Sequence, residues 1–231
     1  MRVIGLLSWY EEPAPWLAEC VAGLAQFCDH LIAVDGPYAM FPGATRKPAS
    51  GSEQADTIAR AAAGAGIGCT IHAPREPWWG NEVAKRDFMF RLAMTMAQPG
   101  VDWLLRVDAD EVFTQVPADT KKILGETDLD VAEVTMWERG DGQDSQFPLR
   151  VLFRALPGIR IQQAHYVVTV PGQDGGTRVL VGNDTCHRAE TALPLWDVRL
   201  EHRTQQRSAM RRALKDQYYA HLPQIEQVTA L

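Results

Sequence analysis

The sequence predicts an α/β protein with a mostly parallel central sheet, flanking helices and a β-rich second half. Two observations carry this prediction. In the first half, four short apolar segments alternate with segments whose apolar residues recur at helical spacing, which is typical of parallel strands with helices on both faces. The second half holds short β-forming runs between glycine-rich turns. We therefore expect one domain over residues 1–231, with halves at 1–115 and 116–231.

Each element of the first half has a local reason. Short apolar runs that end in polar residues predict buried strands. These runs are RVIGLLSW, HLIAVD, GCTIHA and DWLLRV. The intervening helices are indicated by prolines at the start of the first, glycines at the end of the second and an apolar face on the third. They are PAPWLAECVAGLAQF, EQADTIARAAAGAG and NEVAKRDFMFRLAMTMA. Residues 36–52 form a long Gly-, Pro- and Ser-rich loop, and such loops are usually functional or disordered.

The second half reads as strands followed by one helix. Four runs are rich in β-branched residues and bounded by turn residues. They are VAEVTMWE, LRVLFRA, AHYVVTV and TRVLVG. A strongly charged final helix is predicted over TQQRSAMRRALKDQYYAHL.

Composition is that of an ordinary soluble globular protein, with 46% hydrophobic and 23% charged residues. A net charge of −6 argues against nucleic acid as the default partner, although the C-terminal part is locally basic. The four cysteines have no CxxC spacing, so zinc has little support and a reducing compartment is favoured. No signal-peptide pattern opens the chain, and no run approaches the ~20 apolar residues of a membrane span. We expect a cytoplasmic protein.

Acidic residues end two of the predicted strands. Asp108 and Asp110 follow DWLLRV directly, and Asp35 ends HLIAVD. Because ligands of open α/β sheets bind beyond the carboxyl ends of the strands, these acids are expected to converge. Their mutual repulsion calls for a cation, and a hard divalent ion prefers oxygen ligands. A lone DxD often only caps a turn, but its place after the last strand of an alternating half favours a ligand site.

With these acids in place, the chain resembles the family 2 glycosyltransferases with the GT-A fold. DWLLRVDADEVF is similar to the DxD region of that family. Five further segments resemble its other motifs, in the same order along nearly the whole chain. They are LLSWYEE, LIAVDG, PREPWWGNEVAKRDFMFRLA, LRVLFRALPGIRIQQAHY and LEHRTQQRSAMRRALKDQYY. The resemblance implies a GT-A-like nucleotide-diphospho-sugar transferase fold over the whole chain.

The resemblance also implies a metal ion, Mn²⁺ or Mg²⁺, that bridges the donor phosphates and takes up the charge of the leaving group. Asp110 is then the main ligand. Asp108 contacts the metal or the ribose. His202, from the C-terminal segment, is the candidate third ligand, although a lone histidine is as often structural. Glu111 is expected to point elsewhere as a supporting or structural acid.

The same resemblance assigns donor-binding roles. Asp35 is expected to contact the nucleobase or ribose, although a strand-end Asp also caps turns. Trp9 or Tyr10 is expected to stack on the base, with Ser8 in the same loop, although a core position for Trp9 is equally compatible with the sequence. Arg86 matches the arginine of the family and is expected to pair with phosphate or with Asp35. The complete set of donor-binding candidates is Ser8, Trp9, Tyr10, Asp35, Arg86 and Asp108.

Two further groups of basic residues have competing readings. Lys85 adjoins Arg86, and neighbouring helical residues are not expected to face one site together, which favours Arg86 alone. On the final helix, some basic residues are candidates to hold the diphosphate or an acidic acceptor, while a solvated basic face is the simpler interpretation for most of them. They are Arg203, Arg207, Arg211, Arg212 and Lys215.

The catalytic base is the least determined element. An inverting transfer needs a group that takes the proton of the acceptor hydroxyl. Where the family has a His-Glu pair, this chain has His165 and Tyr166. The replacement candidates are Asp197, Asp184 and Glu190, all expected in a late loop region, with Asp197 preferred.

The resemblance therefore predicts a metal-dependent glycosyltransferase that moves a sugar, with inversion, from a nucleotide-diphosphate donor such as a UDP-sugar to an acceptor hydroxyl. The acceptor classes are a glycan, a lipid-linked glycan, a protein or a modified nucleic acid. A non-catalytic nucleotide- or sugar-binding protein of the same fold is an alternative, as is a nucleotidyltransferase. The segment SWYEEPAPW argues against the latter, because it lacks the glycines of a phosphate-binding loop. A DNA-directed transferase is a variant that rests on the basic final helix.

Overall fold

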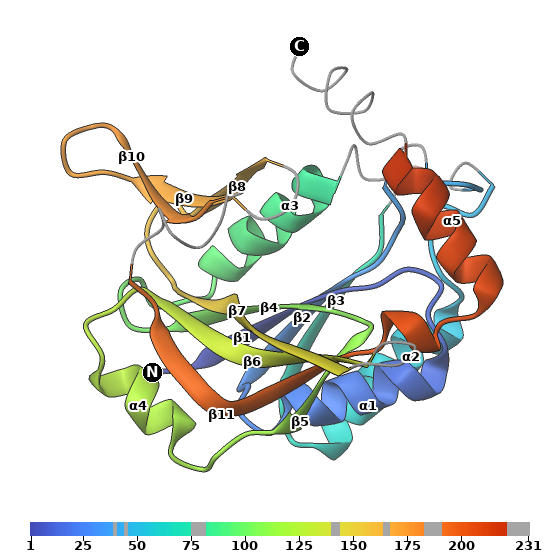
Figure 1. Ribbon diagram of the computed structural model, residues 1–231, viewed down its shortest axis with the longest axis horizontal. Coiled ribbons are helices and arrows are strands. Elements are labelled where there is room, and N and C mark those ends of the chain that lie inside the picture. Colours follow the sequence, from blue (N-terminus) through green and yellow to red (C-terminus); the bar gives the residue numbers. More distant parts are fainter. Residues whose placement is uncertain are drawn as a thin grey trace.

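The computed structural model describes most of the chain with side chains. Its described residues are 1–38, 41–43, 46–74, 82–139, 144–163, 167–182 and 191–220. Figure 1 shows a central sheet with helices on both of its faces.

Four parallel strands form one side of the central sheet. They are β1 (Val3–Ser8), β2 (His30–Val34), β3 (Gly68–His72) and β4 (Trp103–Asp108). β1 lies between β2 and β4, and β3 pairs with the outer edge of β2. All four were predicted, and they end at the same edge of the sheet because they run in the same direction.

The second half of the chain extends this sheet, which has eight strands in the order β3-β2-β1-β4-β7-β6-β11-β5. The added strands are β7 (Asp144–Arg154), β6 (Val131–Arg139), β11 (Leu193–His202) and β5 (Glu111–Gln115). β7 is antiparallel to both β4 and β6, whereas β11 is parallel to β6. β6 and β11 therefore point the same way as β4, so His202 at the end of β11 reaches the edge at which Asp108 ends β4.

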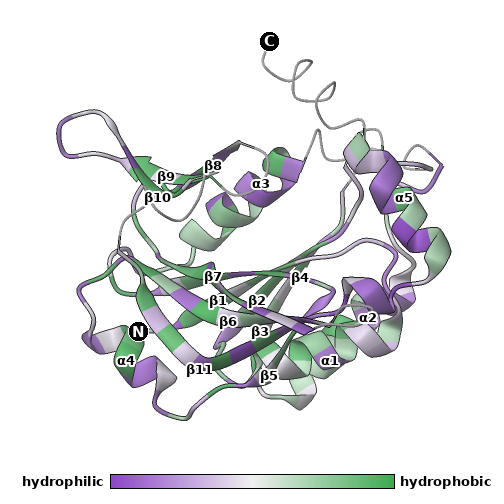
Figure 2. Cartoon of the chain, in the orientation of Figure 1, coloured by the Kyte–Doolittle hydropathy of each residue, from purple (hydrophilic) through white to green (hydrophobic). Residues whose placement is uncertain are grey.

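Helices cover both faces of the sheet. α1 (Ala14–Leu24) and α2 (Ser52–Gly64) share one core cluster with α4 (Thr120–Glu126), while α3 (Glu82–Met94) packs in a second cluster. Adjacent strand residues alternate between the clusters, as the two-residue period of a strand requires: Leu31 belongs to the first and Ile32 to the second. This confirms the predicted α/β class, and Figure 2 shows apolar residues concentrated along the central strands.

A small second sheet packs against α3. It consists of β8 (Arg160–Gln163), β9 (Val167–Pro171) and β10 (Thr177–Val181), all antiparallel to their neighbours.

After β11, a 3-10 turn (Thr204–Gln206) leads into the last described helix, α5 (Ala209–Ala220). In Figure 1, α5 stands beside the edge of the sheet at which β1 and β4 end.

One expectation about the second half is wrong. Asp197 lies on the ten-residue strand β11 and not in a loop. The strand is hidden in the sequence because a bulge between Leu195 and Arg199 interrupts its alternation of buried and exposed residues. The strand β5 and the helix α4 were also not predicted.

Gly23 marks a close approach of α1 to β5. A Cβ atom at this position would lie 2.8 Å from the carbonyl oxygen and 3.0 Å from the amide nitrogen of Phe113. We expect Gly23→Ala to lower the free energy of unfolding by about 1–3 kcal/mol, because backbone must move to accept the methyl group. Urea denaturation measures this change.

The matched control is Gly64→Ala at the end of α2, where a Cβ would meet nothing within 4 Å. Alanine favours helix there, so the free energy of unfolding should stay the same or rise by up to about 1 kcal/mol. An equal response of the two variants would contradict the close packing of α1 on β5.

Candidate functional site

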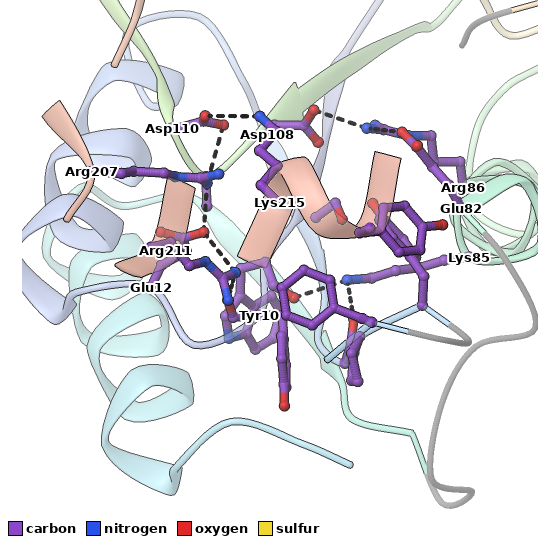
Figure 3. Close-up of a pocket in the computed structure, with 18 of the residues that line it drawn as sticks. Tyr10, Glu12, Glu82, Lys85, Arg86, Asp108, Asp110, Arg207, Arg211 and Lys215 are labelled. Atoms are coloured by element: carbon purple, nitrogen blue, oxygen red, sulfur yellow. Dashed lines mark hydrogen bonds and ion pairs between the residues drawn. The ribbon is translucent and has the colours of Figure 1, made fainter. Parts of the chain in front are cut away.

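A pocket lies at the carboxyl ends of β1 and β4 (Figure 3). Ser8 and Asp108, the last residues of these strands, are register partners. The strand order reverses here, because β2 and β3 continue on one side of β1 and β4 lies on the other. Open α/β sheets bind their ligands at such a switch point.

The pocket wall comes from five parts of the chain that are distant in sequence. They are the loops after β1 and β2, the helix α3, the turn after β4 and the segment that leads into α5. Its charged side chains are Glu12, Glu82, Lys85, Arg86, Asp108, Asp110, Arg207, Arg211 and Lys215.

Asp108 is held by a buried arginine. Nη2 of Arg86 donates to a carboxylate oxygen of Asp108 at 2.8 Å, and Nε of Arg86 donates to Glu82 at 2.8 Å. Burial alone would raise the pKa of Asp108, but the adjacent Arg86 outweighs it and the pKa lies below its usual range. Arg86 was expected to pair with phosphate or with Asp35, but the structure pairs it with Glu82 and Asp108. Its contact with phosphate stays a prediction.

Asp110 is surrounded by donors and cations from the C-terminal segment. Its carboxylate accepts a 2.5 Å hydrogen bond from the Thr204 hydroxyl and lies 3.3 Å from Nε2 of His202. Arg207 and Lys215 lie 3.4 and 3.8 Å from its oxygens. Although burial opposes ionisation, these partners hold the pKa of Asp110 well below its usual range.

His202 reaches this cluster but is engaged at both ring nitrogens. Nδ1 lies 2.6 Å from Glu138 and Nε2 lies 2.8 Å from the Thr204 hydroxyl. Burial lowers its pKa, but the hydrogen bond and charge of Asp110 outweigh burial and raise the pKa to about 9. His202 therefore acts in this structure as a hydrogen-bonded partner of Glu138, Thr204 and Asp110.

Glu111 faces away from the pocket. It is buried, and a carboxylate oxygen accepts the backbone N–H of Asp108 at 2.8 Å. Burial, with the charge of Asp108, raises its pKa to about 7. It therefore holds the turn that carries Asp108 and Asp110, in line with the supporting role expected for it.

Asp35 organises the loop that follows β2. Its carboxylate accepts the backbone N–H of Gly36 at 2.6 Å, and the N–H and hydroxyl of Ser50 at 2.7 and 2.6 Å. The side chain is buried and is not among the residues that line the pocket. These contacts join the two ends of the loop, so the structure shows the turn-capping role, and contact with a base or ribose stays a prediction.

The last residue of β1 and the two residues that follow it have different environments. Ser8 lines the pocket and hydrogen-bonds Tyr38. Trp9 is 2% exposed within the core cluster, so its ring is packed away from solvent while its carbonyl accepts Lys85. The Tyr10 ring lines the pocket and meets Phe41 edge-on at 5.7 Å. Of the two stacking candidates, the geometry favours Tyr10.

Lys85 and Arg86 both line the pocket, contrary to the expectation that only one of two adjacent helical residues does so. Nζ of Lys85 donates to the carbonyls of Trp9 and Gly36 at 2.8 Å each. Successive residues on a helix differ by about 100°, and long side chains at that angle both reach a pocket that lies over the helix. Sequence reasoning therefore missed Lys85.

Sequence reasoning also missed the aromatic part of the pocket and Glu12. Tyr38 and Phe41, from the loop after β2, approach Tyr218 of α5 with ring centroids 5.6 and 6.0 Å apart. Glu12 is buried and receives Arg207 at 2.5 Å and Arg211 at 3.3 Å. The aromatic residues of the loop after β2 were a signal in the sequence. Only the packing of α5 against this loop shows that these residues line the pocket.

The candidate catalytic bases do not reach the pocket as far as the structure describes them. Asp197 is exposed on β11 and is not among the residues that line the pocket. This corrects the preference for Asp197. Asp184 and Glu190 lie outside the described residues, as do His165 and Tyr166.

The described residues do not fit the implied metal ion. Among them, no group of three or more His, Cys, Asp or Glu side chains is placed to hold one. The carboxylate of Asp108 is paired with Arg86, and that of Asp110 with Thr204, His202, Arg207 and Lys215. The two predicted acidic ligands thus face cationic partners, and the predicted histidine ligand is one of the partners of Asp110.

Comparisons with known proteins show no family for this chain. No protein-family model matches the chain, and no curated protein matches it. Among solved structures, a protein assigned as a glucose-1-phosphate thymidylyltransferase from Bacillus anthracis, crystallised with sucrose, has a TM-score of 0.37 and 12% identity. The match covers 60% of this chain and 56% of that one, so it spans less than two thirds of that protein.

No helix among the described residues is long and apolar enough to cross a membrane.

Fold and site together define the class of protein: an α/β protein with a charged, aromatic-walled pocket at the switch point of its sheet. The particular activity is argued from that pocket.

Proposed function

We propose that the protein is a glycosyltransferase with a GT-A-like fold, which binds a nucleoside-diphosphate sugar and transfers the sugar to an acceptor hydroxyl. The observation that carries the proposal is the composition of the switch-point pocket. Its lining combines the aromatic rings of Tyr10, Tyr38 and Phe41 with basic side chains that lie beside them. Aromatic rings suit a nucleobase, and basic side chains suit the phosphates beside it.

An adjoining groove supports a transfer to a second substrate. It shares the wall formed by Tyr10, Glu12 and Arg211 with the donor pocket, and it continues over apolar side chains that include Trp16 and Met210. An acceptor in this groove would lie beside the donor. In the transfer, the acceptor oxygen forms a bond to the anomeric carbon, the bond from that carbon to phosphate breaks, and the nucleoside diphosphate leaves with the electron pair. The acceptor proton passes to a base.

Two parts of the proposal rest on the resemblance alone. A UDP-sugar as donor and inversion at the anomeric carbon follow from the family and not from a described contact.

Glu12 is the carboxylate that borders both the pocket and the groove. Its pKa is raised by burial in spite of Arg207 and Arg211, which is the direction that makes a carboxylate a stronger base.

The products formed distinguish the three functional classes. A glycosyltransferase releases a nucleoside diphosphate from a nucleotide sugar when an acceptor is present. A nucleotidyltransferase instead releases pyrophosphate from a nucleoside triphosphate and a sugar phosphate. A non-catalytic binding protein releases neither. We expect nucleoside diphosphate, and pyrophosphate release would replace the proposal with the nucleotidyltransferase alternative.

Binding by the pocket is tested by exchanging one carboxylate for its amide. We expect Asp108→Asn to weaken binding of the preferred nucleoside diphosphate about tenfold, because a charged acceptor for a ribose hydroxyl is lost. Calorimetric titration of a panel of nucleoside diphosphates measures this change. The control is Asp174→Asn in the exposed turn before β10, which should bind as the wild type does. Equal affinities of all three proteins would place the nucleotide elsewhere.

A further inference from the structure

We propose that Arg207, Arg211 and Lys215 hold the phosphates of the donor, so that this site binds a nucleoside diphosphate without a divalent metal ion. The inference rests on the proposed function and specifies its ligand chemistry. The family resemblance implies the opposite arrangement, in which Asp108, Asp110 and His202 hold a metal ion.

The acids that would ligate a metal already have partners. Arg86 is buried on α3 and contacts Asp108 at 2.8 Å. Around Asp110, the Thr204 hydroxyl donates at 2.5 Å, and the backbone N–H of Arg203 donates to the Asp110 carbonyl at 2.7 Å. The C-terminal segment is thus fastened onto the turn that follows β4, and its cations Arg207 and Lys215 lie next to Asp110.

The three proposed phosphate ligands share one face of the C-terminal segment. Arg211 and Lys215 lie four residues apart on α5, which places them on one face of the helix. Arg207 precedes the helix and pairs with the same Glu12 as Arg211, so the three side chains form one row of cations. Their side chains are 9%, 18% and 26% exposed, so this row faces the protein and not the solvent. In Figure 3 the side chains of Arg207, Arg211 and Lys215 extend into the pocket.

The row carries more positive charge than its protein partners neutralise. Glu12 is the shared carboxylate partner of Arg207 and Arg211. The carboxylate contact of Lys215 is a long one, 3.8 Å to Asp110, and its other contacts are neutral: the Thr204 hydroxyl at 3.4 Å and the Tyr219 ring. Over the whole pocket lining, five basic side chains face four acidic ones. Like charges held this close favour an anion between them, and a diphosphate supplies two or more negative charges.

Arg211 is also oriented for a ligand that combines a ring with phosphate. Its guanidinium lies 5.7 Å from the ring centre of Tyr10 and 5.0 Å from that of Phe41. The backbone carbonyl of Tyr10 accepts from Nη2 of Arg211 at 2.6 Å, which fixes the group further. A fixed, planar guanidinium binds two phosphate oxygens at once, and the aromatic wall beside it suits the base.

The test measures binding of UDP and other nucleoside diphosphates by titration calorimetry, in EDTA and in Mn²⁺ or Mg²⁺. We expect the affinity for the preferred diphosphate to agree within about threefold between these buffers. We also expect it to fall as NaCl is added, because side-chain cations are screened by salt.

Charge-removing variants locate the ligands. In EDTA, Lys215→Gln should weaken binding about tenfold, as expected for one hydrogen bond to a charged group. The matched control is Arg212→Gln, which removes the same charge from α5 at a residue that lines neither pocket and donates to Gln205. Arg212→Gln should bind the diphosphate with the affinity of the wild type. If both variants lost the same affinity, the loss would come from the change in overall charge and not from a contact of Lys215.

The variant Asp110→Asn distinguishes a metal-dependent site from a metal-free site, because it is expected to change the affinity for the diphosphate in opposite directions. A metal site would lose binding when its main ligand is replaced. In the metal-free site, the same change removes an acid that competes with phosphate for Arg207 and Lys215, so the affinity in EDTA should be unchanged or higher.

The outcomes are distinct. Binding in EDTA that depends on Lys215 but not on Arg212 supports the inference. Binding that requires Mn²⁺ or Mg²⁺ and is lost in Asp110→Asn overturns it, while the proposed function stands. Failure of every diphosphate to bind in either buffer overturns both.

Discussion

Replacing Arg86 with alanine should lower the free energy of unfolding by about 3–5 kcal/mol, as expected when one partner of a buried ion pair is removed. The side chain of Arg86 is 4% exposed, and it is the shared partner of Glu82 and Asp108 at 2.8 Å. Without it, two carboxylates that are largely out of water lose their common cation. Urea denaturation at neutral pH, followed by tryptophan fluorescence, measures the loss.

Two comparisons make this result specific. Arg91 lies on the same helix and pairs with Asp87, but it is 61% exposed, so Arg91→Ala should cost less than about 1 kcal/mol. The double variant Arg86→Ala with Asp108→Asn should lose less than the sum of the single changes, since it leaves one fewer unpaired charge. If Arg86→Ala lowered the free energy of unfolding as little as Arg91→Ala, Arg86 would have no role in stability and would serve only to bind the ligand.

Lys85 should make the protein more stable as the pH rises above 7. Burial, with a smaller contribution from Arg86, lowers its pKa to about 7, although Asp35, Asp108 and Glu82 act in the opposite direction. The folded state therefore releases this proton near pH 7, while the unfolded state holds it to about pH 10.5. Between these values the unfolded chain binds more protons, so the free energy of unfolding rises with pH. Below pH 7 both states are protonated and the slope vanishes.

The comparison with Lys85→Met isolates this effect. From pH 7 to pH 9, the stability of the wild type relative to the variant should rise by on the order of 2 kcal/mol. His202 has the opposite slope, because a pKa raised to about 9 gives stability that is lost as the pH rises from 6.5 through 9. Because the wild type and Lys85→Met both contain His202, its contribution cancels when their free energies of unfolding are subtracted. A difference that does not change with pH would mean that Lys85 keeps an ordinary pKa.

Local sequence predicted the first half of the fold well. The alternation of apolar strands with helices was confirmed from β1 to β4. β1, β2 and β4 are buried on both faces and read as continuous apolar runs, while the edge strand β3 is only partly buried. The strand-end acids were placed correctly at one edge of the sheet for the same reason. The second half was harder, since β11 is half exposed and bulged, so its pattern has no fixed period.

The sequence by itself determined the α/β class, the run of strands that ends at Asp108, and the basic character of the final helix. Only the tertiary structure decided what that helix does. Its cations are neighbours of Glu12 and Asp110 across more than 90 residues of chain, and no local pattern encodes such a pairing. The reason is physical: the ionic partner of a buried side chain is set by how elements pack, while periodicity records only which face of an element is apolar.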